Sequence, residues 1–177
     1  MNEGLDTGDI LLAEPLSISP TETAGELHDR LADLAAPCLL KALEMIASGT
    51  APKIPQRDDL ATHCAKLCKT DGFLDWREPS TSLALRVRAM SPWPGAFATI
   101  GGRVLKIHEA VAVEGEGDSS TVLHADAEGL VIAAGTGALA LKTVQLEGRK
   151  RMDAPVFLRG FPLERGQRMD LSFSPRG

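Results

Sequence analysis

The sequence predicts an α/β segment followed by a small β-barrel, and three observations lead to this fold class. A strand-like run, Ile10–Ile18, precedes a long amphipathic helical pattern, which is the order typical of an α/β layer. Residues 50–80 then contain three prolines and show no sustained period, as a linker does. Beyond Trp93, five short β-rich runs alternate with glycine-containing turns, a pattern typical of small barrels such as the OB type.

One helix start is clear in the first half of the chain. Thr23 and Glu26 have the spacing of a capping box, in which each side chain bonds the other residue's backbone N–H. Apolar residues then recur at steps of three and four through Ile46, which predicts a single apolar stripe. Pro37 lacks an N–H donor and is expected to kink or restart the helix, and Gly49 is expected to end it.

The second half predicts a short helix and then the strands. The helix is expected over 80–89, with Leu83 and Val87 on one face, and a last helical turn is expected at Ala154–Arg159. The predicted strands are Ala96–Ile100, Arg103–Val113, Thr121–Ala127, Leu130–Ala134 and Ala138–Leu146.

Composition excludes several classes of protein. The chain has 177 residues, 19 basic and 24 acidic, for a net charge of −5. No apolar run approaches the roughly 18 residues of a membrane-spanning helix. The acidic, glycine-rich start does not resemble a signal peptide, and three cysteines, an odd number, indicate reduced thiols. We therefore expect a cytoplasmic protein without a membrane partner.

The charge is unevenly distributed. Residues 141–177 hold eight basic and four acidic residues, a net +4, so residues 1–140 carry −9. The basic candidates for a phosphate-binding site are Lys142, Arg149, Lys150 and Arg151, the last three contiguous after a predicted strand. Such a loop either meets phosphates or is a solvated turn, and the spacing leaves both interpretations open.

Two further motifs contain residue types that occur in catalytic and metal-binding sites. The Gly4–Asp9 turn contains two carboxylates. A turn of this kind either holds a carboxylate at the edge of a cleft for proton transfer, or it is a solvated turn in which Asp and Gly are ordinary residues. His63, Cys64 and Cys68 have ligand types that zinc accepts, but a structural zinc needs four ligands. The remaining cysteine, Cys38, lies far away in the sequence, so we expect inert thiols and no metal site.

Several segments, in order, resemble methionyl-tRNA formyltransferases. The first half carries MNEGLDTGDILL and LHDRLADLAAPCLLKALEMIASGTA, which resemble the later part of that family's catalytic domain. The segment THCAKLCKTDGFLDW resembles its linker. The start of its C-terminal barrel is similar to RVRAMSPWPGAFATIGGRVLKIHEA in this chain. The closing segment of that barrel is similar to GRKRMDAPVFLRG.

This resemblance implies a function. The family moves a formyl group from 10-formyltetrahydrofolate to the amino group of methionine on initiator tRNA, in translation initiation. The Asp of its GLDTGD-type loop corresponds to Asp6, with the implied role of orienting the catalytic His or a water and helping to move a proton. The barrel of the family binds tRNA, which the resemblance carries over to Lys142 and the 149–151 loop. Neither a metal nor an obligate protein partner is implied.

The resemblance also implies a domain organisation. Residues 1–57 correspond to the C-terminal remnant of a Rossmann-like formyltransferase domain, 58–78 to a linker, and 79–177 to an OB-like tRNA-binding domain. The family's catalytic Asn and His match nothing in the chain, so we expect a truncated enzyme that is inactive alone. Two alternatives stay open: a related formyltransferase with another acceptor, and a free-standing RNA-binding barrel module.

Overall fold

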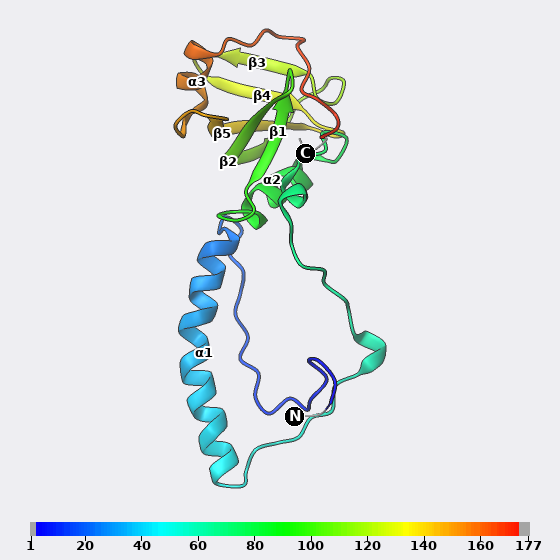
Figure 1. Cartoon of the computed structure of the whole chain (residues 1–177), viewed down its shortest axis with the longest axis vertical. Coiled ribbons are helices and arrows are strands. Elements are labelled where there is room, and N and C mark those ends of the chain that lie inside the picture. The colour runs from blue at the N-terminus through cyan, green and yellow to red at the C-terminus, as the bar shows by residue number, and fades with distance from the viewer. Residues whose placement is uncertain (1–2, 174–177) are drawn as a thin grey trace. The chain divides into compact units, whose positions relative to one another are not determined.

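A computed structural model describes residues 3–173 of the chain. The chain divides into two compact units, an N-terminal unit, Met1–Lys66, and a C-terminal unit, Leu67–Gly177 (Figure 1). The predicted linker, 58–78, thus contains the division between the units. Within the described residues, no helix is both long and apolar enough to span a membrane.

The N-terminal unit is built around the helix α1, Ala24–Ala47. Its start confirms the predicted capping box: Thr23 N donates to Glu26 Oε2 at 2.7 Å, and Glu26 N donates to Thr23 Oγ1 at 3.3 Å. The helix continues through Pro37 without restarting, since a proline removes only one of the hydrogen bonds that hold its turn. It ends just before Gly49, whose φ of +73° suits a residue without a side chain.

The strand predicted at Ile10–Ile18 is wrong. The structure contains only one isolated bridge there, in which Ile10 N donates to Ile54 O at 2.9 Å and Ile54 N to Ile10 O at 3.1 Å. A strand needs a neighbour along its length, and prolines flank the bridge partner at 52 and 55. Among the residues described in this unit there is therefore no sheet, and no α/β layer.

Helix α1 also buries none of its residues. Leu40 and Leu43 are 63% and 52% exposed, and Leu39 and Ile46 are similarly open. Polar contacts hold the preceding segment to the helix, including the ion pair of Lys41 Nζ with Glu14 Oε1 at 2.9 Å. The predicted apolar stripe is present, but it has no core to face.

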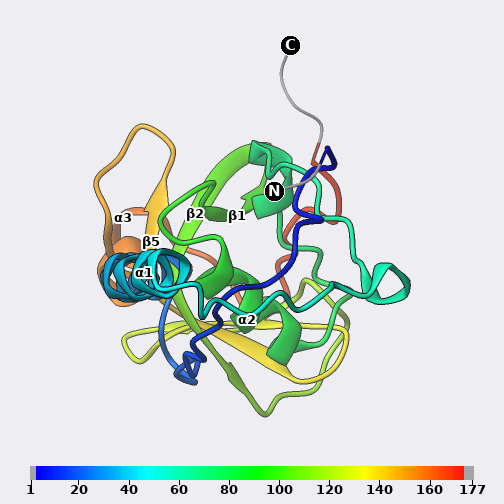
Figure 2. The same ribbon diagram turned by 90° about the horizontal axis from the view of Figure 1, so that it is seen from below.

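The C-terminal unit is an antiparallel sheet with two helices, and it confirms the predicted elements. Its strands are β1 (Ala96–Ile100), β2 (Arg103–Val113), β3 (Val122–Asp126), β4 (Gly129–Ala133), β5 (Ala138–Leu146) and β6 (Met152–Asp153). Helix α2 covers Ser80–Ala89 and α3 covers Ala154–Gly160. The order across the sheet is β1-β2-β5-β4-β3, with β6 paired to β5. The strands curve around α2 (Figure 2).

The sheet is not closed in the described residues, so the structure does not show the OB-like barrel that the sequence predicts. In the described part of the chain, the edge strands β1 and β3 do not pair with each other. The C-terminal segment 166–170 bonds to both edges instead: Val122 N donates to Gln167 O, and Asp170 N donates to Thr99 O, each at 2.8 Å. This segment satisfies backbone groups that an open edge would leave exposed.

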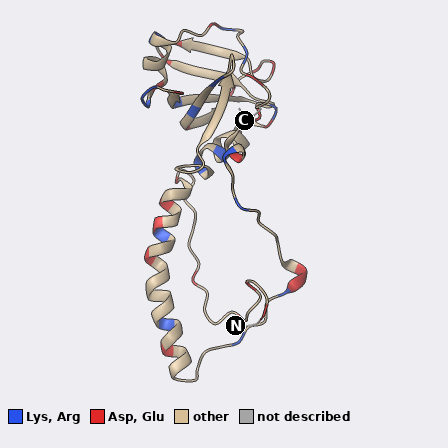
Figure 3. Cartoon of the chain, in the orientation of Figure 1, with Lys and Arg blue, Asp and Glu red and all other residues tan. Residues whose placement is uncertain are grey.

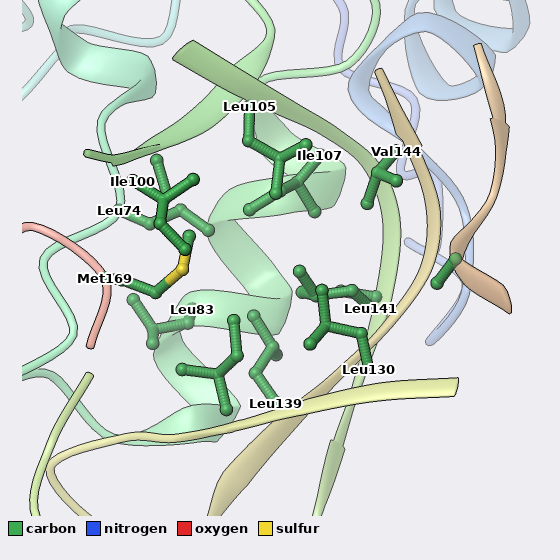
Figure 4. Close-up of a cluster of buried hydrophobic side chains, with 14 of the residues drawn as sticks. Leu74, Leu83, Ile100, Leu105, Ile107, Leu130, Leu139, Leu141, Val144 and Met169 are labelled. Carbon is green, nitrogen blue, oxygen red and sulfur yellow. The ribbon is translucent and has the colours of Figure 1, made fainter. Parts of the chain in front are cut away.

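The core of this unit fills the space between the sheet and α2. Figure 4 shows Leu83 of α2 among strand residues such as Leu105 and Leu139, with Met169 of the C-terminal segment beside them. Leu74 belongs to the same cluster and is fully buried, as is Trp76. The linker pattern of residues 50–80 therefore does not describe these two residues, because their large apolar side chains pack into the core. The exact domain boundaries stay predictions.

Candidate functional site

The three contiguous basic residues lie in the loop between β5 and β6 (Figure 3). The loop begins with a tight turn in which Arg149 N donates to Leu146 O at 2.9 Å. Gly148 has a φ of +75°, a conformation that a side chain would disfavour. Arg149, Lys150 and Arg151 are all exposed. The turn thus projects three cations from one end of the sheet.

A glutamine on β5 anchors this loop. Gln145 Nε2 donates to the carbonyl oxygen of Arg149 at 2.9 Å, and Gln145 Oε1 lies 3.1 Å from Nε2 of His108 on β2. With its nitrogen used as a donor, the amide oxygen accepts from the imidazole N–H. One side chain therefore links the basic loop to the neighbouring strand.

Two irregularities in the pairing of β2 with β5 set the directions of nearby side chains. Ile107 pairs with Val144 and Glu109 with Thr143, which leaves His108 as an extra residue. Ala110 pairs with Leu141, so Lys142 is the extra residue on the other strand. Such bulges re-aim side chains, and Lys142 is exposed directly after buried Leu141. The structure places Lys142 on β5, seven positions before Arg149.

The electrostatic surroundings of His108 identify further members of the site. Burial lowers the pKa of His108 below its ordinary value of 6.5, and the charges of Arg151 and Lys106 lower it further, against the effect of the Gln145 hydrogen bond. Sequence reasoning missed Lys106 and His108. Their signal was the alternation of β2, in which Leu105 and Ile107 are buried, Lys106 between them is exposed and His108 after them is half-buried.

The basic residues at this end of the sheet differ in their partners from three other arginines of the unit. Arg86 pairs with Glu78, Arg77 with Asp75 and Arg168 with Asp118. Among residues 3–173, no carboxylate lies within ion-pairing distance of Lys106, Lys142 or the 149–151 loop. The positive charge of this surface is therefore free to attract an external anion.

Asp6 lies in the other unit, on an exposed turn with a φ of +57°. Gln56 holds this turn, since its Nε2 donates to the carbonyl oxygens of Asp6 at 2.9 Å and of Gly8 at 2.7 Å. The carboxylate is thus presented to solvent from a turn with a defined backbone. Its predicted catalytic role stays a prediction.

The thiols and imidazoles form no metal-binding cluster within the described residues. Cys64 and Cys68 are exposed, free thiols, and the Sγ of Cys68 lies 2.9 Å from Oγ1 of Thr70.

Comparison with known families assigns the fold. The family described as formyl transferase, C-terminal domain, matches residues 66–162, more than half of the chain. The chain belongs to this family. The match begins where the C-terminal unit of the structure begins and ends just after α3, so the family corresponds to the antiparallel sheet with its two helices.

Relatives of this formyl transferase domain extend over both units. The methionyl-tRNA formyltransferase of Aromatoleum aromaticum is 44% identical over 170 residues, covering 96% of this chain and 54% of its own length. The enzyme of the same name from Syntrophus aciditrophicus is 44% identical over 168 residues, 94% of this chain and 54% of its own. The chain thus spans about half the length of these relatives.

Solved structures share the fold at lower identity. HypX from Aquifex aeolicus superposes with a TM-score of 0.63 at 22% identity, covering 91% of this chain and 29% of HypX. A second HypX structure, in complex with tetrahydrofolic acid, has a TM-score of 0.63 at 20% identity, with 96% and 32% coverage.

Proposed function

We propose that the chain forms part of a methionyl-tRNA formyltransferase, which moves a formyl group from 10-formyltetrahydrofolate to methionyl initiator tRNA in the cytoplasm, in translation initiation. The observation that carries the proposal is the 44% identity to enzymes of that name, which extends over nearly the whole chain. The C-terminal unit supplies the tRNA-binding surface in this proposal.

The charge of the candidate site supports an RNA ligand. Phosphates are recognised by exposed lysines and arginines that form no ion pair with a carboxylate of the same protein. Arg149, Lys150 and Arg151 meet that condition, as do Lys106, which pairs with Gln145 of β5, and Lys142 of β5 itself. Gln145 reduces the freedom of the loop before binding, which lowers the entropy lost in the complex.

The catalytic part of the proposal rests on the N-terminal unit. We assign this unit to the Rossmann-like catalytic domain, since the identity to the relatives continues through it. Asp6 is the proposed catalytic carboxylate, acting on the proton released by the attacking amine. HypX, which shares the fold, binds tetrahydrofolic acid, and this supports a folate as the formyl donor in the proposed reaction.

Binding of methionyl initiator tRNA at several salt concentrations tests the proposed surface. The double variant Arg149→Ala with Lys150→Ala is expected to bind severalfold more weakly and to flatten the dependence of log affinity on log salt by about two. Arg57→Ala with Arg77→Ala removes the same charge from exposed residues that are paired to carboxylates, so it serves as the control. An equal effect of both double variants contradicts the proposed surface.

Selectivity separates the proposed function from its alternatives. Preference for initiator over elongator methionyl-tRNA supports the formyltransferase, whereas equal binding of both supports a general RNA-binding module. Failure to bind either tRNA favours a formyltransferase with another acceptor. The sequence predicts no formyl transfer by this chain alone, and turnover with 10-formyltetrahydrofolate above background would contradict that prediction.

A further inference from the structure

A small pocket adjoins the basic loop and combines two arginines with an apolar wall. Its cavity volume is about 90 Å³. It lies where the start of β2, the end of β5 and the helix α3 meet, and its lining residues are Arg103, Leu146, Arg149, Met152, Val156, Phe157, Gly160 and Phe161. A single planar group fits this volume better than a segment of chain.

The guanidinium of Arg103 lies over the aromatic wall of the pocket. The rings of Phe157 and Phe161 stack with centroids 5.3 Å apart and planes 25° from parallel. The guanidinium carbon of Arg103 lies 5.3 Å from the centroid of Phe161, within the range of a cation–π interaction. Arg103 is exposed, and within residues 3–173 it has no ion-paired carboxylate. Phe161 therefore steadies a guanidinium that is accessible to an external group.

The floor of the pocket is apolar and has room for a ligand. Leu146 and Phe157 are buried, Met152 and Phe161 are half-buried, and Val156 is 42% exposed. A Cβ built on Gly160 meets no atom within 4 Å, so the chain itself leaves this position open. Arg149 joins the pocket to the basic loop, because it belongs to both.

We propose, resting on the RNA ligand of the proposed function, that this pocket receives the base of one unpaired nucleotide. The base packs on the apolar floor and against the guanidinium of Arg103, and Arg149 contacts the phosphate of the same nucleotide. Two kinds of observation support this occupant. Arginine planes and apolar surface are what proteins use to hold splayed-out bases. The neighbouring cationic loop supplies the charge that the nucleotide's phosphate requires.

Fluorescence titration with RNA that carries 2-aminopurine tests the pocket. The probes are a short single-stranded oligoribonucleotide and a fully paired duplex of the same length. Arg103→Lys keeps the charge and removes the planar group, so we expect about a tenfold loss of affinity for the single strand, with unchanged affinity for the duplex and an unchanged salt slope. A change in the 2-aminopurine fluorescence on binding, as the base leaves its neighbours in the strand, is expected for the wild type and is reduced in the variant.

A second variant tests the pocket without altering a charge. Gly160→Leu places an apolar side chain at the open position and is expected to weaken single-strand binding, while Gly160→Ala is the smaller matched control. Thermal unfolding of each variant shows that it is folded.

The outcomes separate the pocket from the proposed function. Equal single-strand affinity in wild type and Arg103→Lys overturns the pocket, even where tRNA binding through Arg149 and Lys150 holds. Absence of binding to either RNA by the wild type overturns the proposed function instead. Tight binding of free adenosine monophosphate, with no further gain from the oligonucleotide, overturns the RNA assignment in favour of a small-molecule site.

Discussion

Gln145 connects the strands of the sheet to the basic loop without carrying a charge. Replacing it with alanine removes the hydrogen bonds to Arg149 O and to His108. We expect Gln145→Ala to weaken tRNA binding severalfold while leaving the salt slope unchanged, because every cation is retained. Stability is expected to fall by about 1 kcal/mol.

The control for this prediction is Gln56→Ala, which removes an amide with two backbone acceptors from the N-terminal unit. Filter binding of tRNA and urea unfolding measure both effects. Unchanged tRNA affinity in Gln145→Ala would contradict the positioning role.

His108 makes the stability of the C-terminal unit depend on pH. Its pKa in the folded protein is lowered, chiefly by burial and also by the charges of Arg151 and Lys106. The unfolded chain then binds the proton more readily, so this contribution to stability is present above the unfolded pKa of about 6.5 and is lost as pH falls below it. We expect His108→Gln to lose less stability than the wild type between pH 7.5 and about 5.5.

Urea unfolding at the two pH values measures this difference. His28→Gln, at an exposed position on α1, controls for the removal of a histidine. If His108→Gln and the wild type lose the same stability on acidification, the proposed contribution of His108 is absent.

At the residue scale, the sequence indicates candidate site residues where charged residues are consecutive. The run Arg149–Arg151 was found because three cations stand together. Lys106 and His108 were missed, although the alternation of β2 contained a signal. Their relation to Arg151 depends on the pairing of β2 with β5 and on the extra residue at His108, which no local pattern indicates.

At the scale of elements, α1 has the pattern of a core-facing helix without burying a residue. Contiguous exposed apolar surface favours association with other molecules. We expect Leu40→Ser with Leu43→Ser to reduce binding of an apolar dye and to shift the chain toward the monomer in light scattering. Both leucines are more than half exposed, so the loss of stability is expected to be small.

The matched control is Asp29→Ser with Asp33→Ser, two exposed polar positions on the same helix. A similar change in scattering for both double variants would contradict a role of the apolar face. The strong capping box and the apolar stripe made this helix predictable. The prediction of a strand at Ile10–Ile18 was wrong, because the hydrogen bonds that make a strand come from outside its own sequence.

At the scale of the whole C-terminal unit, the segment 166–170 holds the two sheet edges. Met169 anchors it and is 2% exposed, among Leu74 and Leu83 in the core (Figure 4). We expect Met169→Ala to destabilise the unit by about 2–5 kcal/mol, the usual cost of such a cavity. Chemical denaturation measures the loss.

Leu171→Ala is the control, since Leu171 lies two positions further along and is 39% exposed. Its cost is expected to be well below that of Met169→Ala. Equal and small losses in both variants would show that the segment contributes little to holding the sheet.

The sequence by itself determined helix α1, most elements of the C-terminal unit, and the family to which the chain belongs. Cap spacing, strand alternation and turn glycines act between near neighbours, so they located α1, α2 and the strands β1 and β2 at their observed bounds or close to them. The tertiary structure alone decided what covers the sheet edges, which basic residues share a surface, and where the Arg103 pocket lies. Each of these depends on contacts between residues that are distant in the sequence, such as Thr99 with Asp170 or Val122 with Gln167. A backbone donor or a side chain finds such a partner only when folding brings the two together.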